Sequence, residues 1–215
     1  MAEAAAIVAH QFDDPEQQRD SVSLGMWLFL IQEIMFFGGL FLGYTVYRYK
    51  FPEAFRIGSN QLDLLLGGVN TVVLIVSSLT MALAVHAAQL GKKKAIVWWL
   101  IATIVLGSVF LGIKGVEYGH KFDHHLFPGP HFVFEGPHAR QVQLFFSFYF
   151  VMTGMHALHM VIGIGILAVL VWMAAIGRFH SAYYAPVEMT GLYWHFVDIV
   201  WIFLFPLLYL LGLDR

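Results

Sequence analysis

Five long apolar stretches, separated by shorter polar segments, set the pattern of hydrophobic and polar positions along this chain. They lie near residues 22–47, 63–90, 95–120, 142–176 and 187–212. A helix that rises about 1.5 Å per residue needs roughly 20 apolar residues to cross the hydrocarbon core of a bilayer. The pattern therefore predicts an all-α, polytopic bundle of five transmembrane helices, with its two ends on opposite sides of the membrane.

The remaining segments are short and polar, and they contain the residues that break helices. Residues 1–21 lack the positive start, apolar core and cleavage site that are typical of a signal peptide. Pro and Gly residues mark the connectors after the first and third stretches. We therefore expect a polar N-terminal tail at 1–21 and one five-helix transmembrane domain at 22–215, without an internal repeat.

The composition agrees with lipid as the solvent of the outer surface. Hydrophobic residues make up 59% of the chain and charged residues only 12%, whereas an ordinary soluble domain has roughly 25% charged residues. The absence of cysteine excludes disulfides, thiolate metal sites and cysteine-bridged copper centres. The Lys and Arg residues are scattered and form no basic stripe, so nucleic acid is not an expected partner.

Positive charges are nearly balanced between the two expected sides of the membrane. Arg19, Lys92, Lys93, Lys94 and Arg178 fall on one side, and Arg48, Lys50, Arg56, Lys121, Arg140 and Arg215 fall on the other. The densest cluster, at 92–94, lies in the shortest connector, and such clusters favour the cytoplasmic side. We therefore expect a cytoplasmic N-terminus.

Two pairs of glycines have the spacing that allows helices to approach closely. Gly39 and Gly43 lie four residues apart in the first span, and Gly115 and Gly119 lie four apart in the third. Small residues at this spacing let two backbones come together in lipid. We expect ordinary packing within one bundle at both pairs rather than a dedicated dimer contact.

Ionisable residues inside the predicted spans are the main candidates for a functional role, because a charge at the bilayer centre costs about 2.5–3.5 kcal/mol on insertion scales. Glu33 lies near the middle of the first span. It is either a proton-linked or lipid-linked group or a neutral carboxyl that hydrogen-bonds a neighbouring helix. Lys114 and Glu117 lie three residues apart on one helical face, which is the spacing of an ion pair.

The last two spans carry histidines and acids at helical spacing. They are His156 and His159 in the fourth span and Glu188, His195 and Asp198 near one stripe of the fifth. Imidazoles and carboxylates together suit several first-row metals. The same groups can instead satisfy one another in a hydrogen-bond network, because lipid offers no water to polar groups. We favour the network and expect no metal in this chain.

A second group of histidines lies in the connector after the third span. It comprises His120, His124, His125, His131 and His138. No pair among them has a diagnostic metal-ligand spacing with cysteine. We therefore expect an interfacial loop that packs on a partner.

The order of the polar motifs resembles the subunit III family of haem–copper terminal oxidases, which includes cytochrome c oxidases and quinol oxidases. The resemblance is carried by GMWLFLIQEIMFF at 25–37, NTVVLIVSSLTM at 70–81, KGVEY at 114–118, TGMHALH at 153–159 and EMTGLYWHFVDIVWIFLF at 188–205. It covers nearly everything after the N-terminal tail, and the YWHFVD block is its most specific part.

This resemblance implies an accessory subunit without haem or copper of its own, since those cofactors belong to partner subunits. Such a subunit would dock on subunit I, in a complex that also holds subunit II and pumps protons while reducing oxygen to water. It would stabilise subunit I, support proton uptake and bind phospholipid in a prokaryotic inner membrane, with a periplasmic C-terminus. The longer family members have seven spans, and this chain resembles them from their third span onwards.

The resemblance also suggests roles for individual residues. Glu33 matches the buried, carbodiimide-reactive carboxylate of the family. The polar core of the family is matched by His156, His159, Glu188, His195 and Asp198. Two alternatives stay open, a nitric-oxide-reductase-associated homologue of subunit III and a stand-alone membrane metal or haem protein.

Overall fold

The computed structural model describes residues 11–130, 132–136, 138–181 and 183–210. In chain order the helices are α1 (Pro15–Lys50), α2 (Pro52–Asn60), α3 (Leu64–Gln89), α4 (Lys93–Asp123), α5 (Ala139–Ala175) and α6 (Ala185–Phe205), and the π-helical turn η1 (Pro206–Leu210) continues α6. Five of the helices, with η1 included in the last, are long and apolar enough to cross a membrane. The predicted all-α fold with five spans is therefore confirmed.

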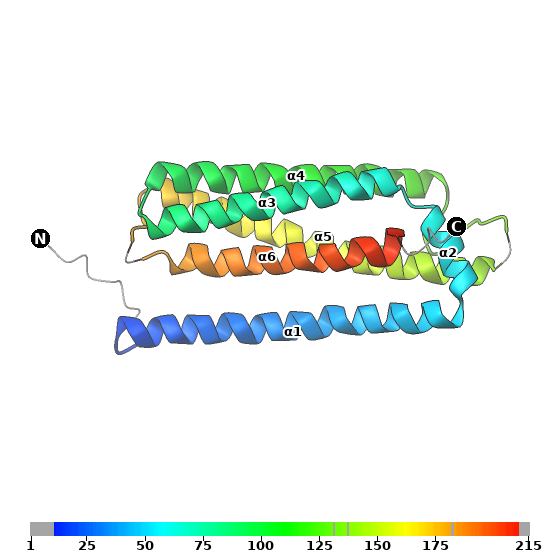
Figure 1. Ribbon diagram of the computed structural model, residues 1–215, viewed down its shortest axis with the longest axis horizontal. Coiled ribbons are helices and arrows are strands. Elements are labelled where there is room, and N and C mark those ends of the chain that lie inside the picture. Colours follow the sequence, from blue (N-terminus) through cyan, green and yellow to red (C-terminus); the bar gives the residue numbers. More distant parts are fainter. Residues whose placement is uncertain (1–10, 131, 137, 182, 211–215) are drawn as a thin grey trace, which may run out of the picture.

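The five long helices lie side by side and alternate in direction (Figure 1). α5 and α6 lie between α1 on one side and the α3–α4 pair on the other. The α3–α4 turn and the α5–α6 connector lie at the end where α1 begins, and α2 lies at the opposite end, where α6 finishes. The lysines at 92–94 and Arg178 are therefore at one end of the bundle, as the alternation of five spans requires.

Local sequence explains where the helices begin. Asp14 caps α1 by accepting a hydrogen bond from the backbone N–H of Gln17 at 2.7 Å, and Pro15 occupies the first turn, where a missing N–H costs nothing. The helix thus starts before residue 22, and residues 15–21 of the expected tail are helical. Asp63 caps α3 in the same way, through the backbone N–H groups of Leu65 and Leu66.

The connector after the first span contains the short helix α2, which closes one end of the bundle. Its buried residues include Phe55 and Ser59, which lie on one face. The Ser59 hydroxyl donates to the backbone carbonyl of Leu208, and the Tyr44 hydroxyl donates to that of Leu207. Carbonyls near the end of a helix lack partners within the helix, so these side chains complete the end of the last span.

α6 is the central helix of the bundle, and Trp194 is the residue that ties it to three others. The Trp194 indole N–H donates to the Ser77 hydroxyl of α3 at 3.0 Å. Its ring lies against Gly107 of α4 and Gly163 of α5, where a Cβ atom would approach the ring to 2.9 Å. Close helix packing therefore depends on these two glycines.

The glycine pairs singled out by their spacing mostly do not mark close contacts. At Gly39, Gly115 and Gly119, no atom of another element lies within 4 Å of the place of a Cβ, while at Gly43 the Phe148 ring is 3.3 Å away. The prediction of close packing at these pairs is wrong except at Gly43, because spacing alone does not say which face of a helix meets a neighbour.

Candidate functional site

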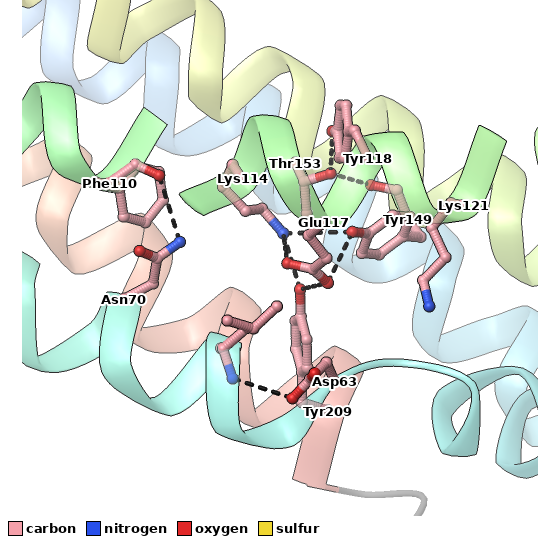
Figure 2. A network of polar contacts seen from close by, with 12 residues as sticks. Asp63, Asn70, Phe110, Lys114, Glu117, Tyr118, Lys121, Tyr149, Thr153 and Tyr209 are labelled. Atoms are coloured by element: carbon pink, nitrogen blue, oxygen red, sulfur yellow. Dashed lines mark hydrogen bonds and ion pairs between the residues drawn. The ribbon is translucent and has the colours of Figure 1, made fainter. Parts of the chain in front are cut away.

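The carboxylate of Glu117 is the centre of a buried polar network between α4, α5 and η1 (Figure 2). Lys114 Nζ lies 2.9 Å from Oε2 of Glu117, one helical turn away. The hydroxyls of Tyr149 and Tyr209 both donate to Oε1, at 2.9 and 2.6 Å. Both oxygens of the carboxylate are thus bonded, as a charge buried in lipid requires.

The Lys114 ammonium is satisfied by the same residues. It donates to the hydroxyl of Tyr209 at 2.7 Å and approaches that of Tyr149 at 3.3 Å. Its Nζ also lies 4.9 Å from the centre of the Trp201 ring, which is within the range of a cation–π contact. An ammonium has three N–H donors, and here they face an anion and two phenols.

The network continues towards the end of α4 (Figure 2). Thr153 donates to the backbone carbonyl of Tyr149 at 2.6 Å, so the Tyr118 hydroxyl, 2.5 Å from the threonine oxygen, supplies the proton of their contact. Lys121 is mostly buried and donates to the backbone carbonyl of Gln61 in the turn before α3. The polar groups of this region therefore link neighbouring segments of one chain.

Glu33 of α1 meets His159 of α5, which places two candidate residues in one contact. His159 Nε2 lies 3.1 Å from Oε2 of Glu33, and both side chains are about 11% exposed. His159 Nδ1 lies 2.8 Å from the backbone carbonyl of Met155, which can only accept, so Nδ1 carries a proton. The Nε2 contact then holds one shared proton, either on the carboxyl or on the ring.

His156 points elsewhere, although it is only one turn before His159. It is fully buried between the rings of Phe110 and Trp201, with ring centres 5.3 and 5.2 Å away. Neither of its ring nitrogens has a hydrogen-bond partner in the described part of the chain. The two histidines therefore do not share a ligand.

The acids and the histidine of α6 lie along its contact with α3. His195 Nδ1 lies 2.8 Å from the Ser78 hydroxyl. Asp198 is buried next to them, and Glu188 is half-buried nearer the start of α6, where His195 and His86 line the same groove. This group is separate from the Glu117 network and from the Glu33–His159 contact.

Over the described ranges, no three His, Asp or Glu side chains converge in a way that could hold a metal ion. The side chains of His120, His124, His125 and His138 are exposed, and His131 lies outside the described residues. His138 Nε2 lies 3.6 Å from the carboxylate of Glu53 at the surface. The chemistry of these contacts is hydrogen bonding and charge pairing between helices.

Sequence reasoning missed the tyrosines and the serine that complete these contacts. Tyr149, Tyr209 and Ser78 are polar groups within the membrane-spanning helices, and each bonds a residue that had been singled out. A hydroxyl inside an apolar span is the signal that could have identified them, because a polar group in lipid needs a hydrogen-bond partner within the protein. Their partners could not be chosen without the packing of the helices.

Comparison with known proteins gives a consistent result over nearly the whole chain. A family model described as "Cytochrome c oxidase subunit III" matches residues 8–213. A cytochrome c oxidase subunit 3 from Synechocystis sp. is 36% identical over 188 residues, which cover 87% of this chain and 74% of that protein. A quinol oxidase subunit 3 from Bacillus subtilis is 34% identical over 191 residues, covering 88% and 87% of the two chains. The chain therefore belongs to the cytochrome c oxidase subunit III family.

Proposed function

We propose that this chain docks on the catalytic subunit I of a proton-pumping haem–copper oxidase and stabilises it in the membrane. The family consists of accessory subunits of oxidases that take electrons from cytochrome c or quinol, and the chain is such a subunit, part of an oxidoreductase complex without a catalytic centre of its own. Docking on subunit I, contact with subunit II and support of proton uptake are the specific parts of the proposal.

The observation that carries the proposal is the way in which Glu117 is satisfied. Its carboxylate binds one lysine and two tyrosines of the same chain. A group so completely bonded is not available to a substrate or a metal, and it holds three segments of the bundle in one arrangement. This fixed arrangement of the helices around Glu117 supports a role as a scaffold for a neighbouring catalytic subunit.

Lipid binding is a further part of the proposal, and it centres on the seam between α1 and α6. A groove of about 240 Å³ lies there, lined by apolar residues that include Phe37, Phe41 and Phe203. An acyl chain needs only such an apolar surface. Glu33, one turn before Phe37 on α1, is bonded to His159 and would hold the helices that form this groove.

We place the chain in a prokaryotic inner membrane, with the start of α1 in the cytoplasm and the end of α6 towards the periplasm. The five spans and the bacterial relatives support a multi-pass membrane protein. The lysine cluster at 92–94 lies at the end where α1 begins, and short cytoplasmic loops are rich in lysine.

Purification of the tagged chain from its own membranes in mild detergent tests the proposal. Mass spectrometry of the bound proteins and a reduced-minus-oxidised haem spectrum should reveal a haem–copper subunit I, with the haem assigned to that partner. Recovery of the chain alone with stoichiometric metal or haem would overturn the accessory role. Recovery with a nitric oxide reductase instead would assign it to the denitrifying alternative.

A further inference from the structure

The seam between α3 and α6 contains a groove that faces outward from the bundle and has a polar floor. Its volume is about 390 Å³, and Ser78, His195 and Asp198 are among its lining residues. Its rim includes Ile75 of α3 and Ile199 of α6, which are 54% and 50% exposed. Ser78, His195 and Asp198 thus lie beneath an apolar surface that would otherwise meet lipid.

Asp198 is not satisfied within the chain. It is 3% exposed, and neither oxygen of its carboxyl has a hydrogen-bond partner in the described part of the protein. The Ser78 hydroxyl interacts with this carboxyl but has no well-formed hydrogen bond to it, and lies 2.8 Å from His195 Nδ1. A hydroxyl has a single proton and can also accept, so even when Ser78 accepts from His195 and turns its proton towards Asp198, one oxygen of the carboxyl still lacks a donor.

The other two buried carboxyls of the spans behave differently. Glu117 accepts hydrogen bonds at both oxygens, and Glu33 is bonded to His159. A buried polar group without a partner is costly in lipid, where water does not replace the missing bond. The difference between Asp198 and these two acids therefore points to a partner outside the chain.

The depth of the groove determines which partner fits. Asp198 is close to the middle of the span Ala185–Leu210, so it lies near the centre of the bilayer. A lipid headgroup does not reach this depth, and an acyl chain has no hydrogen-bond donor. A transmembrane helix is the membrane component that brings a donor side chain to the bilayer centre.

The shape of the seam agrees with a helix as the occupant. A second groove adjoins the first one and shares Ala82 and His195 with it. It extends along α3 to Gln89 and along α6 back to Glu188. Asp198 lies ten positions after Glu188, which corresponds to roughly 15 Å along the helix axis. The two grooves together therefore form an elongated surface with polar groups along its length.

We propose that a transmembrane helix of a neighbouring oxidase subunit lies in the α3–α6 seam and donates a side-chain hydrogen bond to the Ser78–His195–Asp198 group. This inference rests on the proposed function, because it requires an oxidase complex around the chain. It adds the face of the bundle that makes the contact and the chemistry that the partner must supply.

Site-directed photo-cross-linking in the purified complex tests the location. The natural chain has no cysteine, so the variants Ile75→Cys and Ile199→Cys each contain a single thiol. This thiol is labelled with a benzophenone maleimide, which carries the photoreactive group. Val105→Cys on α4 is the matched control, since Val105 is as exposed as Ile75, at 54%, but lies away from the seam. We expect protein cross-links to an oxidase subunit from positions 75 and 199, and lipid adducts from position 105.

Lipid adducts alone at positions 75 and 199, in a complex that still contains the haem-bearing partner, would overturn the inference and leave the proposed function intact. Loss of the haem-bearing partner from the unmodified complex would instead defeat the proposed function, and this inference with it. The two failures are therefore distinguishable in one preparation.

Substitution of Asp198 tests the chemistry. Asp198→Asn keeps a carbonyl acceptor of the same shape, whereas Asp198→Leu removes every acceptor. We expect the Asn variant to stay in the complex through a detergent wash and the Leu variant to be released about tenfold more readily. Equal retention of both variants, together with lipid adducts at positions 75 and 199, would show that the seam makes no such contact.

Discussion

The hydroxyl of Tyr209 donates a 2.6 Å hydrogen bond to Oε1 of Glu117, which connects the π-helical end of the last span to α4. The same oxygen accepts from Tyr149 of α5, and the other oxygen pairs with Lys114. Three segments that are distant in sequence thus converge on one carboxylate. Because lipid supplies no alternative partner, the loss of any member leaves another polar group unsatisfied.

Removal of the Glu117 carboxylate is expected to destabilise the subunit strongly. Glu117→Leu leaves the Lys114 ammonium buried without its counter-ion, and breaking a buried ion pair from one side costs about 3–5 kcal/mol. Tyr209→Phe removes one hydrogen bond and should cost ~1 kcal/mol, within the range measured between membrane helices. Unfolding of the detergent-solubilised subunit by SDS, followed by circular dichroism, measures both changes.

A double variant separates charge burial from lost packing. Lys114→Met combined with Glu117→Leu removes both charges, so we expect it to be more stable than Glu117→Leu alone. If the double variant is the less stable of the two, the attribution to an unpaired lysine is wrong.

Glu33 is expected to support the lifetime of the oxidase rather than its chemistry. Glu33→Gln keeps a group that donates to Nε2 of His159, so both assembly and the initial rate of oxygen consumption should be unchanged. Glu33→Leu leaves Nε2 unpaired, which should lower stability by about 1 kcal/mol and shorten the time to inactivation during turnover. An oxygen-electrode trace of the purified complex gives both quantities. Immediate and complete loss of oxygen reduction in the Gln variant would contradict this role.

Two glycines of α5 offer a test of the packing around Trp194. A Cβ at Gly163 would lie 2.9 Å from the Trp194 ring, whereas at Gly165 no atom of another element lies within 4 Å. Gly163→Ala should therefore overpack the core and cost about 1–3 kcal/mol, and Gly165→Ala should be neutral or slightly stabilising. Equal SDS unfolding midpoints for the two variants would show that the ring moves aside without cost.

The fold could be predicted from the sequence because apolar length alone specifies a membrane-spanning helix. The contacts that each polar side chain makes with other helices could not be predicted in this way. Helical spacing fixes the direction of a side chain only relative to its own helix. His156 and His159 differ by about 60° around α5, and this rotation sends one towards Phe110 and the other towards Glu33. Lys114 and Glu117 needed no such information, because their contact lies within one turn.

The orientation of the bundle can be read with two single cysteines, because the natural chain contains none. Leu90, beside the lysine cluster, and His124, after α4, are both exposed and lie at opposite ends of α4. If the lysines face the cytoplasm, a membrane-impermeant maleimide added to spheroplasts should label His124→Cys and leave Leu90→Cys unlabelled until the membrane is opened. The reverse pattern would invert the assignment and place the start of α1 in the periplasm. Because both positions are exposed, a difference in labelling reports the side of the membrane rather than burial within the bundle.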